Sequence, residues 1–331
     1  LSSYEYEDES LYHNRSFVHH TGTRGGLLKL FGGEPADFDI AAIAPSTADL
    51  VWEQQLDLRV LLDVVRSLGE LGVGMSPEEL DQALNERVLE LDMTLGALVE
   101  RLDTTAGLIL AVDESRPLGI PGESFWFPYT DFLLRIDGLS DLADAIAKKA
   151  ALDPFIASER TDEWVIIKPA ISLPPPWNAY EPSVAKEVAT GRMYIVSSPA
   201  FLERCISTIE SVAQSSDFIR AFRQLSPDGN GLTYLSPRMT RQMHGLLDRV
   251  IEANGSSVTT TIARFFLPDI GYPVGWVVTN RDDGILFTSN TPSSHKSTLL
   301  TLGYAALLPA LAVVGTSMLA PEPSATQSPF D

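Results

Sequence analysis

An uncharged apolar segment near the end of the chain constrains the fold more than any other feature. Residues 297–320 (STLLTLGYAALLPALAVVGTSMLA) form a run of 24 residues without a single Asp, Glu, Lys or Arg. An α-helix rises about 1.5 Å per residue, so a helix of this length is roughly 36 Å long and can cross a hydrocarbon core about 30 Å thick. We therefore expect residues 297–320 to form a transmembrane helix. A buried helix that completes a soluble core is the alternative.

The rest of the chain divides by composition into three parts. Residues 1–35 are first acidic (YEYEDES) and then rich in glycine, which is typical of an extended or partly ordered arm. Residues 36–292 alternate apolar runs with turn and cap signals, as one folded domain does, and two sub-halves meet near residues 150–160. Residues 321–331 form a polar, Pro-rich tail.

Within residues 36–292, strand and helix patterns occur in clusters rather than in strict alternation. Apolar runs predict strands at 39–45, 108–112, 132–137, 164–170, 191–198, 232–236, 258–267, 275–280 and 284–290. Helical spacing and cap signals predict helices at 56–72, 77–91, 141–150, 199–209, 215–225 and 237–253. Ser76 and Glu79 have the spacing of a capping box, Ser198 and the proline after it open the fourth helix, and residues 281–284 suit a hairpin loop. We expect an α+β fold with a mainly antiparallel sheet packed with helices, strand–helix units in two related halves, and a C-terminal apolar helix.

The charge balance and the single cysteine exclude several classes of protein. The 24 Lys and Arg residues stand against 44 Asp and Glu residues, which gives a net charge of −20. Nucleic-acid binding needs clustered basic residues, so we expect no nucleic-acid partner. Cys205 is the one cysteine, which excludes an internal disulfide framework and a multi-cysteine metal site.

No residue pattern in the chain identifies a reaction, and we expect no catalytic, cofactor or metal residues. His13, His19 and His20 lie near acidic residues and are of the type that binds metals, but their spacing matches no metal-binding motif. Cys205 falls on the apolar face of a predicted helix, where a packed structural thiol is the simpler interpretation. An enzyme is therefore the less favoured class.

Two aromatic loops are candidates for a recognition surface. The segment LPPPWNAYEP joins two predicted strands and carries Trp177 and Tyr180 beside three prolines. The segment ESFWFPY carries Trp126 and Tyr129. A stiff backbone loses little entropy on binding, and Trp and Tyr are favoured interface anchors. The alternative is that these side chains fold onto the sheet as part of the core.

Three stretches of the chain resemble a known family. They are DFDIAAIAPSTADLVWEQQLDLRVLLDVV, TGRMYIVSSPAFLERCISTIES and SSDFIRAFRQLSPDGNGLTYLS. They are similar to a family of uncharacterised bacterial envelope proteins known only as a domain of unknown function, and the likeness extends over roughly residues 36–292. The resemblance implies an exported, membrane-tethered α+β domain. The sequence as given shows no signal peptide, and whether one was removed ahead of Leu1 stays open.

These observations favour a non-catalytic, membrane-anchored protein of the cell envelope. We expect residues 297–320 to be the contact with the membrane and the large acidic domain to lie outside the cytoplasm. There it binds a protein or glycan partner or acts in assembly. One alternative is a hydrolase whose site converges only in three dimensions. Another is a fully soluble binding protein in which residues 297–320 are a buried helix.

Overall fold

We describe the chain from a computed structural model. The residues that the structure describes are 2–8, 10–20, 26–71, 74–88, 93–101, 103–119, 126–255 and 271–292. The predicted strand at 258–267, the apolar segment 297–320 and the tail 321–331 lie outside them.

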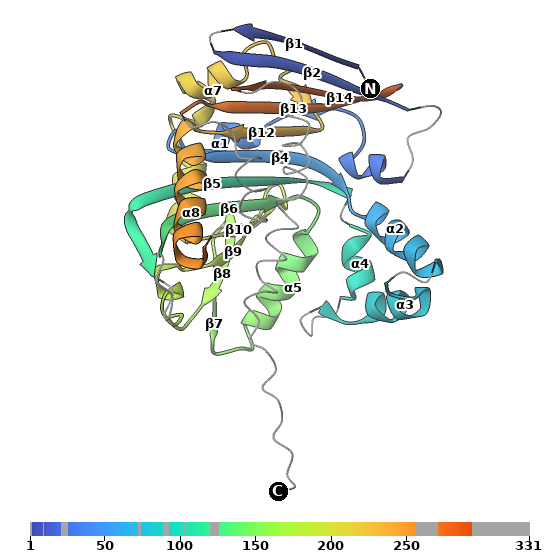
Figure 1. Ribbon diagram of the computed structural model, residues 1–331. Coiled ribbons are helices and arrows are strands. Elements are labelled where there is room, and N and C mark those ends of the chain that lie inside the picture. The colour runs from blue at the N-terminus through green and yellow to red at the C-terminus, as the bar shows by residue number, and fades with distance from the viewer. Residues whose placement is uncertain are drawn as a thin grey trace, which may run out of the picture.

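A single large antiparallel sheet runs through the molecule (Figure 1). Its strand order is β1-β2-β14-β13-β12-β4-β5-β6-β10-β9-β8-β7. The strands are β1 (Ser2–Asp8), β2 (Leu11–His19), β4 (Leu50–Asp57), β5 (Asp103–Gly119), β6 (Trp126–Ile136), β7 (Ile156–Arg160), β8 (Trp164–Pro169), β9 (Ser183–Glu187), β10 (Met193–Val196), β12 (Gly231–Leu235), β13 (Val274–Arg281) and β14 (Gly284–Thr291). Two short strands, β3 (Ala36–Asp37) and β11 (Asp228–Gly229), pair separately. The predicted α+β class with an antiparallel sheet is confirmed.

The helices lie on both faces of this sheet (Figure 1). They are η1 (Gly26–Phe31), α1 (Ile40–Ile43), α2 (Arg59–Glu70), α3 (Pro77–Asn85), α4 (Leu95–Val99), α5 (Ser140–Ala150), η3 (Trp177–Ala179), α6 (Pro199–Ile206), η4 (Val212–Gln214), α7 (Ser216–Ala221) and α8 (Pro237–Asn254). The capping box predicted at the start of α3 is present: Ser76 Oγ accepts from Glu79 N, and the Glu79 carboxylate accepts from Ser76 N. Helix α3 ends at Asn85, before the predicted end at residue 91.

The two faces of the sheet bury different apolar residues because successive side chains of a strand point to opposite faces. On one face, α1, α6, α7 and η4 pack against Val51, Ile109 and Leu133, which are fully buried. On the other face, Met239 of α8 packs against the cluster that contains Leu50, while α5 covers a separate cluster. The main core therefore lies on the α1 and α6 side.

One predicted strand is wrong. Residues 39–45 were expected to be a buried strand, but they contain α1, and the neighbouring strand is β4 at Leu50–Asp57. The apolar run is short and rich in alanine, which suits a single helical turn that Pro45 then ends. In β4 the polar residues Glu53, Gln54 and Gln55 interrupt the apolar pattern, so the strand signal there is weak.

The segment assigned to an N-terminal arm contributes strands to the sheet. β1 and β2 form an antiparallel hairpin, and β2 pairs with β14 from the other end of the described chain. In Figure 1 this hairpin lies at the top of the sheet, at the opposite end from β7.

Among the described residues, no helix is both long enough and apolar enough to cross a bilayer.

Candidate functional site

The structure separates two of the four predicted recognition residues onto opposite faces of the sheet. Trp126 and Tyr129 lie three positions apart in β6, and side chains at an odd spacing in a strand point to opposite faces. Trp126 is 40% exposed, and the guanidinium carbon of Arg249 in α8 lies 4.4 Å from its ring centroid. Tyr129 is 3% exposed. Its environment is therefore that of a core residue.

Tyr129 and Tyr180 are brought together. Their rings stack with centroids 4.7 Å apart, and the guanidinium carbon of Arg116 lies 3.8 Å from the Tyr129 centroid. The Tyr129 hydroxyl donates to Asp131 at 3.1 Å, and burial raises the pKa of Tyr129 to about 12. The Tyr180 hydroxyl accepts from the amide of Thr130 at 3.4 Å. This pair joins the β8–β9 loop to β6.

Trp177 is the most exposed of the four, at 49%. It lies in η3, directly after the three prolines, and hydrogen bonds from Asn178 N to Pro174 O and from Tyr180 N to Trp177 O hold the turn. Exposed apolar side chains also occur in neighbouring segments. They are Leu152 (83%), Phe155 (61%) and Ile171 (57%).

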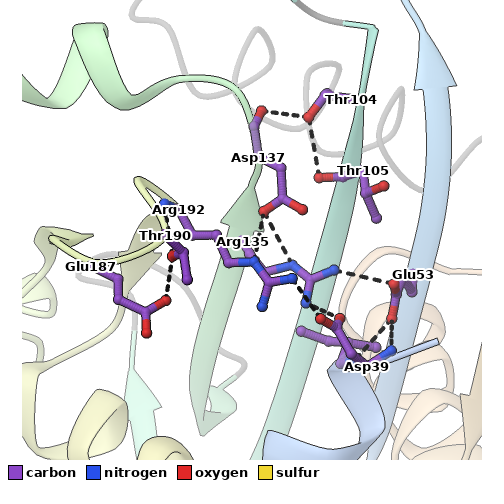
Figure 2. A network of polar contacts seen from close by, with 10 residues as sticks. Asp39, Glu53, Thr104, Thr105, Arg135, Asp137, Glu187, Thr190 and Arg192 are labelled. Carbon is purple, nitrogen blue, oxygen red and sulfur yellow. Dashed lines mark hydrogen bonds and ion pairs between the residues drawn. The ribbon is translucent and has the colours of Figure 1, made fainter. Parts of the chain in front are cut away.

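A network of five charged side chains lies on the main core face (Figure 2). Arg135 of β6 is at its centre, with a side chain only 2% exposed. It pairs with Asp39, with Glu53 of β4 (Nη2 to Oε1, 3.1 Å) and with Asp137 (Nε to Oδ1, 3.6 Å). Arg192, from the turn between β9 and β10, pairs with Asp39 at 2.7 Å and with Asp137 at 3.6 Å. Ion pairs therefore join the start of α1, β4, β6 and the β9–β10 turn, which are far apart in the sequence.

The strand register explains how Arg135 reaches Glu53. Glu53 is opposite Gly107 of β5, and Gly107 is opposite Arg135, so the three residues form one row across the sheet. A Cβ atom on residue 107 would lie 2.8 Å from Ile40 Cδ1. Glycine at this position lets α1 pack closely on the strand between the two charged side chains.

Burial and pairing shift the pKa values of the carboxyl groups in different directions. Burial raises the pKa of Glu53 and of Asp137, and the charge of Arg135 offsets part of each effect. Burial acts in the same direction on Asp39, but the bonds and charges of Arg135 and Arg192 hold its pKa below the ordinary value. Perturbed carboxyl groups are typical of functional sites and also of structural ion-pair networks.

The pairing favours a structural role for this network. Glu53 also accepts hydrogen bonds from the amides of Ile40 (2.8 Å) and Asp39 (3.1 Å), so its carboxylate is occupied by the start of α1 and by Arg135. A carboxylate held in this way is poorly placed to accept a proton from a substrate. The network fixes α1 to the sheet.

A second buried carboxylate fixes α8. Asp49 accepts from the amide of Val112 (2.8 Å), from Ser236 Oγ (2.7 Å) and from Nε and Nη2 of Arg238 (2.7 and 2.6 Å). Ser236 also caps α8, since its hydroxyl accepts from Met239 N. This arrangement ties the start of α8 to β4 and β5.

The structure also shows the surroundings of Cys205 and His13, which the sequence brought into consideration. Cys205 is fully buried in the main core, where burial raises its pKa to about 12. His13 hydrogen-bonds Asn290 at 2.8 Å. In the part of the chain that the structure describes, no group of three or more His, Cys, Asp or Glu residues is arranged to hold a metal ion.

Sequence reasoning missed the charge network, although one signal was present. Arg135 interrupts the apolar run FLLRID, and alternation places it on the same face as the buried Leu133. A lone arginine at such a position needs buried carboxylates, but the sequence does not say which ones.

Comparisons of the chain with protein-family models, with curated proteins and with solved structures found no match. The class is therefore defined by the fold: an α+β protein built on one large antiparallel sheet.

Proposed function

We propose that this chain is a non-catalytic, membrane-anchored protein of the cell envelope whose acidic α+β domain binds a partner or serves in assembly. The observation that supports binding is the exposure of Trp177 on a proline-stiffened loop. The proposal of an anchor rests on the 24 uncharged residues at 297–320 and on the resemblance to envelope proteins. In this arrangement the domain lies outside the cytoplasm.

The case for Trp177 is energetic. A half-exposed tryptophan contributes less hydrophobic stabilisation than a fully buried one. A partner that covers the side chain gains the remaining free energy of burial. The three prolines before it limit the backbone freedom that binding would otherwise remove. The partner is a protein or a glycan, since aromatic side chains of this kind serve both.

The test is capture of a partner from native membranes by the intact chain. We expect the Trp177→Ala variant to lose most of the captured material while its melting temperature changes little. Ile209→Ala is a matched control, because Ile209 is 91% exposed and lies in the segment after α6. A large fall in melting temperature with capture intact would make Trp177 a core residue and remove the support for this surface.

A further inference from the structure

The large sheet ends in an open strand at β7. In the described part of the chain, β7 pairs only with β8, and it lies at the lower end of the sheet in Figure 1. Its last three residues, Ser158, Glu159 and Arg160, are all exposed. An edge of this kind presents backbone donors and acceptors that can pair with another strand.

Two hydrogen bonds at the ends of β7 show which of its backbone groups face outward. Ala170 N donates to Phe155 O at 2.8 Å, and Thr161 N donates to Trp164 O at 2.8 Å. In an antiparallel pair, residues that bond to the neighbouring strand alternate with residues whose N–H and C=O point away. Odd-numbered residues of β7 therefore bond to β8. Ser158 and Arg160 direct their backbone groups to the open edge.

We propose that this edge pairs with β7 of a second copy of the chain, so that two sheets join in a symmetric antiparallel dimer. Only outward-facing residues can bond across such an interface, so Ser158 must lie opposite an even-numbered residue of the other copy. The register that overlaps all of β7 places Ser158 opposite Ser158, on the two-fold axis.

Charge and strand overlap together favour this register over its two neighbours. It sets Arg160 opposite Ile156 and Glu159 opposite Ala157, with no like charges facing each other. A shift of two residues in one direction sets Glu159 opposite Glu159, which is destabilising. A shift in the other direction sets Arg160 opposite Pro154, which lies before the start of β7, so fewer residues of the strand are paired. The sequence of β7 is thus complementary to itself in one alignment.

The backbone bonds of the interface follow from this register. The Ser158 amide of each copy donates to the Ser158 carbonyl of the other, and each Arg160 amide donates to the opposite Ile156 carbonyl. The Ile156 amide already donates to Asp153 O at 3.2 Å, so it takes no part. Phe155, 61% exposed, lies just before the strand and is partly covered by the second copy.

Cross-linking tests the register directly. In the full chain, Ser158→Cys places the two thiols of the dimer directly opposite each other at the two-fold axis. In Glu159→Cys each thiol lies one residue away from the axis, so the two are not opposite each other. The native Cys205 is fully buried and does not interfere. Under mild oxidation we expect Ser158→Cys to form a covalent dimer at least several-fold faster than Glu159→Cys. Equal rates, or no dimer from Ser158→Cys, would overturn the proposal.

Sedimentation of the full chain in detergent gives a second readout. Ser158→Pro removes an outward N–H and leaves the bonds to β8 in place, so we expect it to shift the chain to monomer. Ser158→Ala keeps the amide and should sediment like the wild type. A dimer that Ser158→Pro does not weaken rules out this edge. The wild type could instead sediment as a monomer with another protein bound, and Ser158→Pro could lose that protein. This result would show that the edge binds a different partner, and the proposed dimer would be wrong.

Discussion

The buried Arg135 lies next to a glycine of the neighbouring strand. Gly107 lies between Arg135 and Glu53 in the sheet and allows Ile40 of α1 to pack against β5. This row of the sheet therefore has two requirements. Ile40 must pack closely on Gly107, and Arg135 must pair with Glu53. At the residue scale these two requirements give separate predictions.

We expect Gly107→Ala to destabilise the fold by about 1–3 kcal/mol, because the added methyl group would overlap Ile40 and force it to move. The measurement is the midpoint of urea unfolding. Gly119→Ala is the control, since Gly119 is in the same strand and has no atom within 4 Å of the added Cβ. Equal midpoints for the two variants would show that Ile40 moves without cost.

Arg135→Met should cost about 3–5 kcal/mol, because it leaves Glu53 buried without its cation. Chemical denaturation of Arg135→Met, Glu53→Gln and the double variant measures the coupling. We expect the double variant to recover part of the loss. If the two single effects simply add, the residues do not stabilise each other.

At the scale of elements, α1 is held to β4 and β6 by charge as well as by packing. Glu53 accepts from the amides at the start of α1, and Arg135 and Arg192 both bind Asp39 just before it. A four-residue helix has little stability of its own, so its position depends on these contacts. Its attachment should therefore respond to pH.

The sign of that response follows from the pKa shifts. The pKa of Glu53 is raised from its ordinary value of 4.5, so the folded protein holds a proton that the unfolded chain releases. The contribution of Glu53 to the unfolding free energy therefore falls as pH rises from 4.5 to the folded-state pKa of this group. Asp39 has the opposite sign, and its contribution is lost as pH falls below the ordinary value of 3.8.

We expect Glu53→Gln to flatten the decline in stability above pH 4.5, measured as the unfolding free energy across a pH series. Glu78→Gln, at an exposed position in the first turn of α3, is the control. A wild-type profile that rises through this window, or one that Glu53→Gln leaves unchanged, would contradict the assignment.

At the scale of the whole molecule, residues 297–320 decide between the anchored and the soluble interpretations. We expect deletion of residues 297–331 to move the protein from the membrane fraction to the soluble fraction and to leave its melting temperature nearly unchanged. Fractionation and thermal unfolding of both forms provide the measurement. A truncated chain that loses its cooperative transition would instead make the segment part of the core.

The sequence by itself determined the elements whose signals are local. The capping box at Ser76 and Glu79, the cap at Ser198, and the hairpin of β13 and β14 depend on residues a few positions apart, so the pattern was sufficient. The α+β class and the antiparallel sheet followed from the order of these elements. Net charge, which needs no structure, is the ground on which we expect no nucleic-acid partner.

Tertiary structure alone decided what depends on pairing across long separations. The polar run in β4 became a central strand because its neighbours β12 and β5 supply the hydrogen bonds, and β2 joined the sheet through β14. The same applies to the candidate sites. Tyr129 and Tyr180 stack because two distant segments meet, while Arg135 finds Asp39 and Glu53 only after strand pairing sets the register. A sequence records which side chains need partners, but the strand register decides which partners they find.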